Sequence, residues 1–95
     1  MSLRFTWDPN KARQNLHKHQ VNFDEATTVF GDPFAGVEDD PEHSVDEQRY
    51  LIIGHSSRNR LLIVIFTEPA PDTIRIISAR LATNTERKSY EQFNR

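Results

Sequence analysis

The spacing of apolar and polar residues along the chain predicts five strands and three helices. Apolar side chains at every second position, or in an unbroken aliphatic run, indicate strands, whereas apolar residues three or four positions apart indicate helices. The predicted strands cover 3–7, 34–37, 48–54, 60–67 and 73–81, and the predicted helices cover 9–19, 22–30 and 84–93. Consecutive hairpin strands with helices on one side make a small antiparallel sheet. We therefore expect one α+β domain over 1–95, in the order β-α-α-β-β-β-β-α.

Each predicted helix begins with a residue whose side chain can accept a hydrogen bond from the first turn. These N-cap residues are Asp8, Asn22 and Thr83. Glu25 and Glu86 stand three positions after the second and third of them, which is the spacing of a capping box. The starts of the helices are therefore well defined by local sequence.

The connecting segments differ in character. The stretch 38–47 holds six of the fourteen acidic residues and no basic one, so it is predicted to be a solvated loop. Segments 55–59 and 68–72 are rich in turn-forming residues and predict short connections. The strand at 60–67 between them is continuously aliphatic, which favours a central position in the sheet, buried on both faces.

The strand at 73–81 carries charges among its aliphatic residues and leads directly into the last helix. Strict alternation places Arg80 on one face of this strand and Arg75 on the other. Arg80 can meet Glu86, Arg87 and Tyr90 where the strand joins the helix. Such a group suits the binding and cleavage of a phosphodiester, and it equally suits an ordinary ion-pair network.

Composition limits the other possibilities. The chain has a net charge of −2, but the bases outnumber the acids outside the acidic stretch, so a locally basic surface is compatible with it. It contains no cysteine, and no apolar run approaches the length of a membrane span or a signal peptide. These features indicate a cytoplasmic protein without disulfides.

The residue spacings expected at a metal site or a nucleotide-binding loop are absent from the sequence. His17 and His19 do not have the spacing of a helical metal pair, and there is no glycine-rich phosphate loop. Each histidine is by itself more typical of a surface or hydrogen-bonding residue than of a catalyst, and His19, at the end of a helix beside Lys18, is the best candidate among them. Glu47 and Arg49 are two positions apart on a strand, where they can pair with each other or reach a ligand. We predict neither a metal ion nor a cofactor.

Several segments together resemble the BrnT-type toxins of type II toxin–antitoxin systems, within the RelE/ParE-like toxins. The resemblance spans nearly the whole chain and is most specific in the run RIISAR, with ATxxER and Tyr90 after it. The other matching residues are Phe5–Asp8, Lys11, Asn15, Lys18, His19, Val21, Phe23, Glu25, Ala26, Val29, Phe30, Asp32, Pro33, Asp40, His43, Glu47, Arg49, Gly54 and Ser56. Gln20 departs from the family pattern, which has glycine after the Lys-His pair. A glycine there suits a left-handed helix end, so Gln20 must adopt that conformation at some cost or end the helix differently.

The resemblance implies a RelE-like fold with a curved antiparallel sheet, an N-terminal helical hairpin and a C-terminal helix. It also implies a metal-independent endoribonuclease that slows translation. The implied partner is a ribbon–helix–helix antitoxin, which forms a heterotetramer with the toxin and makes the contacts to operator DNA.

For RNA cleavage we expect a set of catalytic residues, namely Arg80, Glu86, Arg75, His19 and Arg49. Arg80 and Arg75 would stabilise the phosphorane with support from Arg49, and either Glu86 or His19 would be the base. The residues expected to contact the substrate are Lys18, Arg87, Tyr90 and Glu47. Two alternatives remain open: a toxin that acts on a protein target without catalysis, and an inactive co-repressor that only binds its partner.

Overall fold

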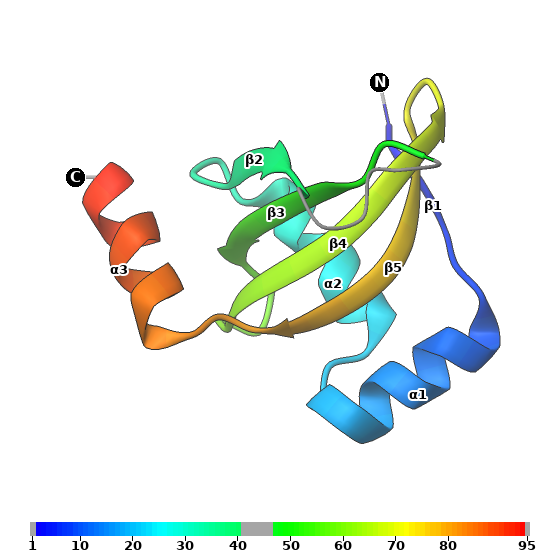
Figure 1. Cartoon of the computed structure of the whole chain (residues 1–95), viewed down its shortest axis with the longest axis horizontal. Coiled ribbons are helices and arrows are strands. Elements are labelled where there is room, and N and C mark those ends of the chain that lie inside the picture. The colour runs from blue at the N-terminus through cyan, green and yellow to red at the C-terminus, as the bar shows by residue number, and fades with distance from the viewer. Residues whose placement is uncertain (1, 41–46, 95) are drawn as a thin grey trace.

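The computed structural model describes residues 2–40 and 47–94, which form a twisted sheet with helices around it (Figure 1). The elements follow one another in the predicted order, with one 3-10 turn added. They are β1 (Arg4–Thr6), α1 (Pro9–His19), α2 (Phe23–Thr28), η1 (Val29–Gly31), β2 (Gly36–Asp39), β3 (Tyr50–His55), β4 (Leu61–Ala70), β5 (Thr73–Leu81) and α3 (Asn84–Phe93). Among these residues, no helix is long and apolar enough to cross a membrane.

The strands lie in the order β1-β5-β4-β3-β2. Neighbouring strands from β2 to β5 are antiparallel, and β4 lies at the centre, as its aliphatic run predicts. The prediction of a fully antiparallel sheet is wrong at one edge, because β1 pairs with β5 in parallel, with Arg4 opposite Thr73. This pairing joins distant parts of the chain, so local sequence patterns contain no signal for it.

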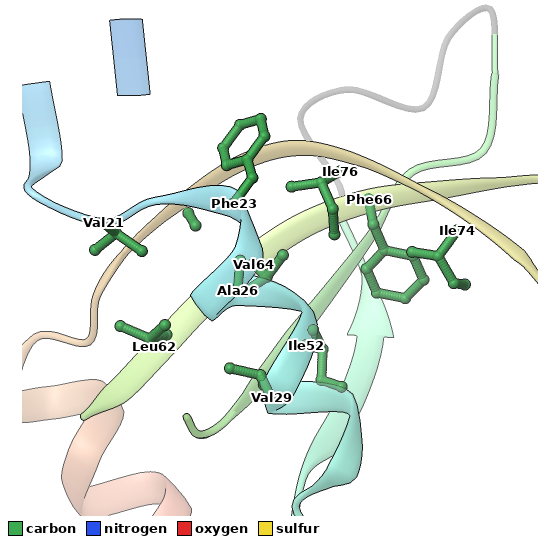
Figure 2. Close-up of a cluster of buried hydrophobic side chains, with 11 residues drawn as sticks. Val21, Phe23, Ala26, Val29, Ile52, Leu62, Val64, Phe66, Ile74 and Ile76 are labelled. Carbon is green, nitrogen blue, oxygen red and sulfur yellow. The ribbon is translucent and has the colours of Figure 1, made fainter. Parts of the chain in front are cut away.

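One face of the sheet forms the main core together with α2 and the corner before it (Figure 2). Val21, Phe23, Ala26 and Val29 from the helical segment meet side chains of β3, β4 and β5. The sheet side chains in this cluster are Ile52, Leu62, Val64, Phe66, Ile74, Ile76 and Ala79. Burial of these apolar groups supplies the main driving force for folding.

The helix α1 is fixed to the backbone of β5 by a buried polar residue. The Asn15 side-chain amide donates to the carbonyl oxygens of Val21 (2.9 Å) and Ala79 (2.8 Å). Its own side-chain oxygen accepts from the Ala79 backbone N–H at 3.0 Å. Asn15 therefore ties α1, the following corner and β5 together.

The opposite face of the sheet is partly covered by α3, so the expectation of helices on one side only is wrong. Figure 1 shows α3 standing beside β2 and β3, while α2 lies behind the sheet. Residues of α3 and of β2, β3 and β4 line a shared groove, described below. β5 ends at Leu81, and α3 begins after its N-cap Thr83, so the chain changes direction at this junction.

The predicted helix starts are confirmed, since Asp8, Asn22 and Thr83 all accept hydrogen bonds as N-caps. Several strand boundaries differ from prediction. β2 begins at Gly36, because a turn held by Asp32 occupies 32–35, and it extends to Asp39 by pairing with β3. β4 continues to Ala70, so the predicted connection at 68–72 shrinks to a two-residue turn.

Gln20 ends α1 in the left-handed conformation, with φ 60° and ψ 28°. It thus adopts the glycine-like backbone directly, and its side-chain amide donates to the His17 carbonyl at 3.0 Å. Of the acidic stretch, Glu38 and Asp39 belong to β2 and Asp40 is buried, which differs from a fully solvated loop. The positions 41–46, including His43, lie outside the described residues.

Candidate functional site

The junction between β5 and α3 holds an arginine and a glutamate in a fixed pair. Arg80 donates from two guanidinium nitrogens to the two oxygens of Glu86, at 2.8 and 2.9 Å. Glu86 also accepts from the Thr83 backbone N–H at 2.8 Å, and Thr83 Oγ1 accepts from the Glu86 N–H, which completes the capping box. One carboxylate therefore caps the helix and orients the guanidinium.

Electrostatics keeps this pair ionised. The hydrogen bonds from Arg80 are the main cause that lowers the pKa of Glu86 to about 2, against an opposing effect of burial. The same bonds raise the pKa of Arg80. Arg80 has five N–H donors, of which Glu86 takes two and the Leu81 carbonyl takes one. Because the Arg80 side chain is 40% exposed, its remaining donors are available to a ligand.

A second polar cluster lies one helical turn further along α3. The Tyr90 hydroxyl donates to Asp32 Oδ2 at 2.7 Å, and its oxygen lies 3.2 Å from His55 Nδ1. Asp32 Oδ2 also accepts from the His55 backbone N–H at 2.7 Å, and Asp32 Oδ1 accepts from the Phe34 N–H. This cluster links the turn before β2, the end of β3 and the inner face of α3.

The pKa values of Tyr90 and Asp32 shift in opposite directions. Burial, with the hydrogen bond to Asp32, raises the pKa of Tyr90 to about 12. Burial also acts to raise the pKa of Asp32, but hydrogen bonds from His55, Tyr90 and Phe34 outweigh it, so the net shift is downward. Asp32 is therefore a carboxylate and Tyr90 a neutral phenol at neutral pH.

A groove of about 330 Å³ runs between α3 and the edge formed by β2 and β3. Its floor is apolar and includes Leu51, Ile53 and Ile63. Glu38 and Glu86 are the charged residues in its lining. Its rim carries large apolar side chains that are well exposed, namely Phe34, Val37 and Phe93. The groove thus offers an apolar surface with a negative border.

Arg75 shares a face with Arg80, which strict alternation did not predict. The pairing of β4 with β5 shifts register between Ile65 and Phe66, so that Ile77 has no direct partner. Beyond this bulge Arg80 lies opposite Ile63, while Arg75 lies opposite Thr67. Since Leu62, Val64 and Phe66 point into the core, their neighbours on β4 and the two arginines point to the opposite face.

Arg75 and Arg80 do not meet, because five strand positions separate them by roughly 16 Å. Arg49 directly precedes β3, whose first residue Tyr50 pairs with Phe66, so Arg49 lies toward the same end of the sheet as Arg75, which pairs with Thr67. Arg49 lies 3.6 Å from Glu47, as the sequence spacing allowed. Within the described part of the chain, Arg49 Nε and Thr67 Oγ1 are buried and lack a hydrogen-bond partner.

The remaining candidates take no part in the Arg80–Glu86 pair. Lys18 and His19 end α1, and within the described residues neither forms a hydrogen bond or ion pair with Arg80 or Glu86. Arg87 is exposed on α3. Tyr90 is only 8% exposed and its ring meets His55 edge-on, so it is not free to stack on a nucleobase.

From the sequence, His55 is only one of four histidines that could include a general base, and Asp32 only a residue that matches the family, because only the folded chain brings them to Tyr90. Sequence reasoning missed an ion pair between Arg60 and the buried Glu25, which also contacts Ser56, the residue after His55. Arg60 donates to both oxygens of Glu25, at 2.9 and 2.5 Å, and the Ser56 hydroxyl donates to Glu25 Oε2 at 2.6 Å. The available signal was that Glu25 and Ser56 are both among the residues that match the family. Across the described ranges, no group of three or more residues could hold a metal ion.

Comparison with known proteins bears on the family and on the fold. Residues 7–86 match the family model described as the ribonuclease toxin BrnT of type II toxin–antitoxin systems. The crystal structure of the Brucella abortus ribonuclease toxin BrnT superposes with a TM-score of 0.64 and 21% sequence identity. The match covers 87% of this chain and 100% of that one, and it shows a shared fold. A search of curated proteins gives no match.

Proposed function

The chain belongs to the BrnT family of ribonuclease toxins of type II toxin–antitoxin systems, and from that premise we propose that it cleaves RNA without a metal ion and so slows translation. The observation that carries this proposal is the orientation of Arg80 by Glu86. A guanidinium held by one carboxylate, with donors still available, is suited to bind a phosphate and to stabilise the charge that develops on it.

We assign different roles to the two members of the pair. Metal-free cleavage requires a base for the 2′-hydroxyl, cations for the phosphorane and a proton for the leaving 5′-oxygen. With a pKa of about 2, Glu86 takes up a proton poorly at neutral pH, so its role is to position Arg80. His19 ends α1 and forms no hydrogen bond with Arg80 or Glu86 within the described residues, so we do not assign it as the base.

The other basic residues on the face of Arg80 serve substrate binding in this proposal. Arg75 and Arg49 lie toward the same end of the sheet, and we assign them to a neighbouring phosphate of the same RNA strand. Arg87 is exposed on α3 and adds positive charge near the junction. Lys18 and Glu47, expected to contact substrate from the sequence, form no hydrogen bond or ion pair with Arg80 within the described residues, and we assign them no catalytic role.

Membership of a type II system implies an antitoxin protein as partner. We propose that this antitoxin has a ribbon–helix–helix DNA-binding domain, forms a heterotetramer with the toxin and alone contacts operator DNA, all within the cytoplasm. We also propose that the fold is related to the RelE-like toxins. The groove with its exposed apolar rim gives one observation in favour of the alternative function, in which the chain acts only by binding another protein.

The direct test is cleavage of a single-stranded RNA by the purified chain in excess EDTA. We expect cleavage by the wild-type protein and a loss of at least about tenfold in Arg80→Ala, because Arg80 contributes in the transition state. Arg58→Ala is the matched control, since Arg58 lies exposed in the turn between β3 and β4. Intact RNA with a chain that still arrests growth would favour non-enzymatic toxicity, and normal growth with retained antitoxin binding would favour the co-repressor.

A further inference from the structure

The cluster of Asp32, Tyr90 and His55 holds a histidine whose second ring nitrogen is unoccupied. We propose that His55 is the general base of the cleavage reaction and that Tyr90 and Asp32 fix it in the reactive tautomer. This inference rests on the proposed function and names the group that the reaction still lacks. The inference follows from counting the hydrogen-bonding protons that Asp32, Tyr90 and His55 can share.

The tautomer of His55 is determined by its neighbours. Asp32 is a carboxylate and can only accept, so the Tyr90 hydroxyl must donate its one proton to it, over 2.7 Å. The Tyr90 oxygen then has only lone pairs to offer toward His55 Nδ1 at 3.2 Å. Nδ1 must therefore be the protonated nitrogen of the neutral ring. Asp32 Oδ2, 3.9 Å from the same nitrogen, favours that proton further.

This assignment leaves Nε2 of His55 with a free lone pair. No hydrogen bond to Nε2 forms within the part of the chain that the structure describes. The His55 side chain is 36% exposed, so a substrate hydroxyl can reach it. A ring held at Nδ1 by a hydrogen bond, with a bare and accessible Nε2, has the arrangement of a general base.

The position of His55 also relates it to Arg80. Ile63 of β4 pairs with Ile53 of β3 on one edge and with Arg80 of β5 on the other, so these three side chains point to the same face of the sheet. His55 is two positions after Ile53 and points to that face as well. The inner face of α3 bridges the two, since Glu86 holds Arg80 and Tyr90, one turn later, holds His55. β3 and β5 are separated by one strand, and His55 and Arg80 are also offset by two residues along the strands, so their backbones are roughly 12 Å apart. In this proposal a ribose and its 3′-phosphate span that distance, with the phosphate at Arg80 and the 2′-hydroxyl at His55.

The chemistry balances without a co-reactant other than water. Nε2 of His55 accepts the 2′-hydroxyl proton while the 2′-oxygen bonds to phosphorus. The bond from phosphorus to the 5′-oxygen breaks, and that oxygen takes a proton from solvent. The products are a 2′,3′-cyclic phosphate and a 5′-hydroxyl end. Arg80 stabilises the charge on the phosphorane, and the carboxylate of Asp32 stabilises the imidazolium through Tyr90 and the Nδ1–H.

Two measurements test this inference. The first is nitrogen NMR of the wild-type imidazoles, which reports the tautomer directly. We expect protonated Nδ1 and bare Nε2 in His55, and a shift toward the other tautomer in Tyr90→Phe. A wild-type His55 that is protonated at Nε2 overturns the proposal, whatever the activity of the protein.

The second measurement is cleavage rate under single-turnover conditions with saturating protein. His55→Gln should lower the rate constant about 10²–10⁴-fold with little change in RNA affinity, because a general base acts on the chemical step. Tyr90→Phe should lower it less. His17→Gln, an exposed histidine on α1, is the control. If the wild type cleaves RNA and His55→Gln cleaves it equally fast, His55 is not the base, although the proposed function stands.

If the wild type yields no cleavage, the proposed function and this inference fail together. Should His55→Gln fail to fold, which circular dichroism would show, the wild-type tautomer and the Tyr90→Phe rate decide. Tyr90→Phe with full activity and an unchanged tautomer would refute the role of Tyr90 and Asp32 in fixing the ring.

Discussion

Loss of the Glu25 carboxylate should destabilise the fold more than any surface substitution. Glu25 accepts two hydrogen bonds from Arg60 and one from Ser56, and its side chain is only 4% exposed. Arg60 also donates to the Gln20 carbonyl at 3.1 Å. The change Glu25→Gln keeps the shape of the side chain and removes its charge. It also places the NH2 group of the amide against a hydrogen-bond donor, either Arg60 or Ser56. It therefore tests the pair without creating a large cavity.

The magnitude follows from the burial of the two partners. Removing one member of a fully buried ion pair costs about 3–5 kcal/mol. Because the Arg60 side chain is 30% exposed and can regain water, we expect about 2–4 kcal/mol for Glu25→Gln. For a domain of this size that corresponds to a fall in Tm of roughly 10–25 °C.

Urea unfolding followed by circular dichroism gives the free energy directly, with Glu91→Gln as the control. Glu91 is exposed on α3 and forms no hydrogen bond within the described residues. The hydrogen bonds from Arg60, against an opposing effect of burial, lower the folded-state pKa of Glu25, so its contribution is complete above the unfolded pKa of about 4.3 and is lost as pH falls below it. A loss below about 1 kcal/mol at pH 7 would refute this account of the buried pair.

Three further changes test other parts of the structure. Asn15→Ala removes three buried hydrogen bonds, and we expect urea unfolding to show a loss of about 2–4 kcal/mol. Gln20→Gly relieves a left-handed residue at φ 60°, so a thermal melt should show a gain of about 0.5–1 kcal/mol. The Glu86 carboxyl should titrate near pH 2 by NMR, and Arg80→Ala should raise that midpoint; the stability from this pair is present above the unfolded pKa and is lost as pH falls toward 2.

Features that depend on neighbours in the sequence were predictable. The caps at Asp8, Asn22 and Thr83 each involve residues two or three positions away, and all three form. Arg80 and Glu86 are six positions apart across a strand–helix junction, so the sequence alone was enough to predict that they can meet. The physical reason is that short chain segments restrict which side chains can come together.

Features that depend on the folded chain were not predictable from the pattern. The spacing of Arg75 and Arg80 in the sequence predicts that they lie on opposite faces of β5. The bulge at Ile77 shifts the alternation by one residue, so both lie on the same face. His55 and Tyr90 come from separate elements whose contact is fixed only when α3 packs on the sheet. Tertiary packing therefore decides most of the candidate site.

The parallel pairing of β1 with β5 has a consequence for how the chain is made. During translation, β1 leaves the ribosome first but finds its strand partner only after β5 has been synthesised. α3, with Glu86 and Tyr90, follows later still. A nascent chain thus carries neither a closed sheet edge nor the residues that position Arg80 and His55. The Arg80–Glu86 and His55–Tyr90 contacts can therefore form only once α3 has been synthesised.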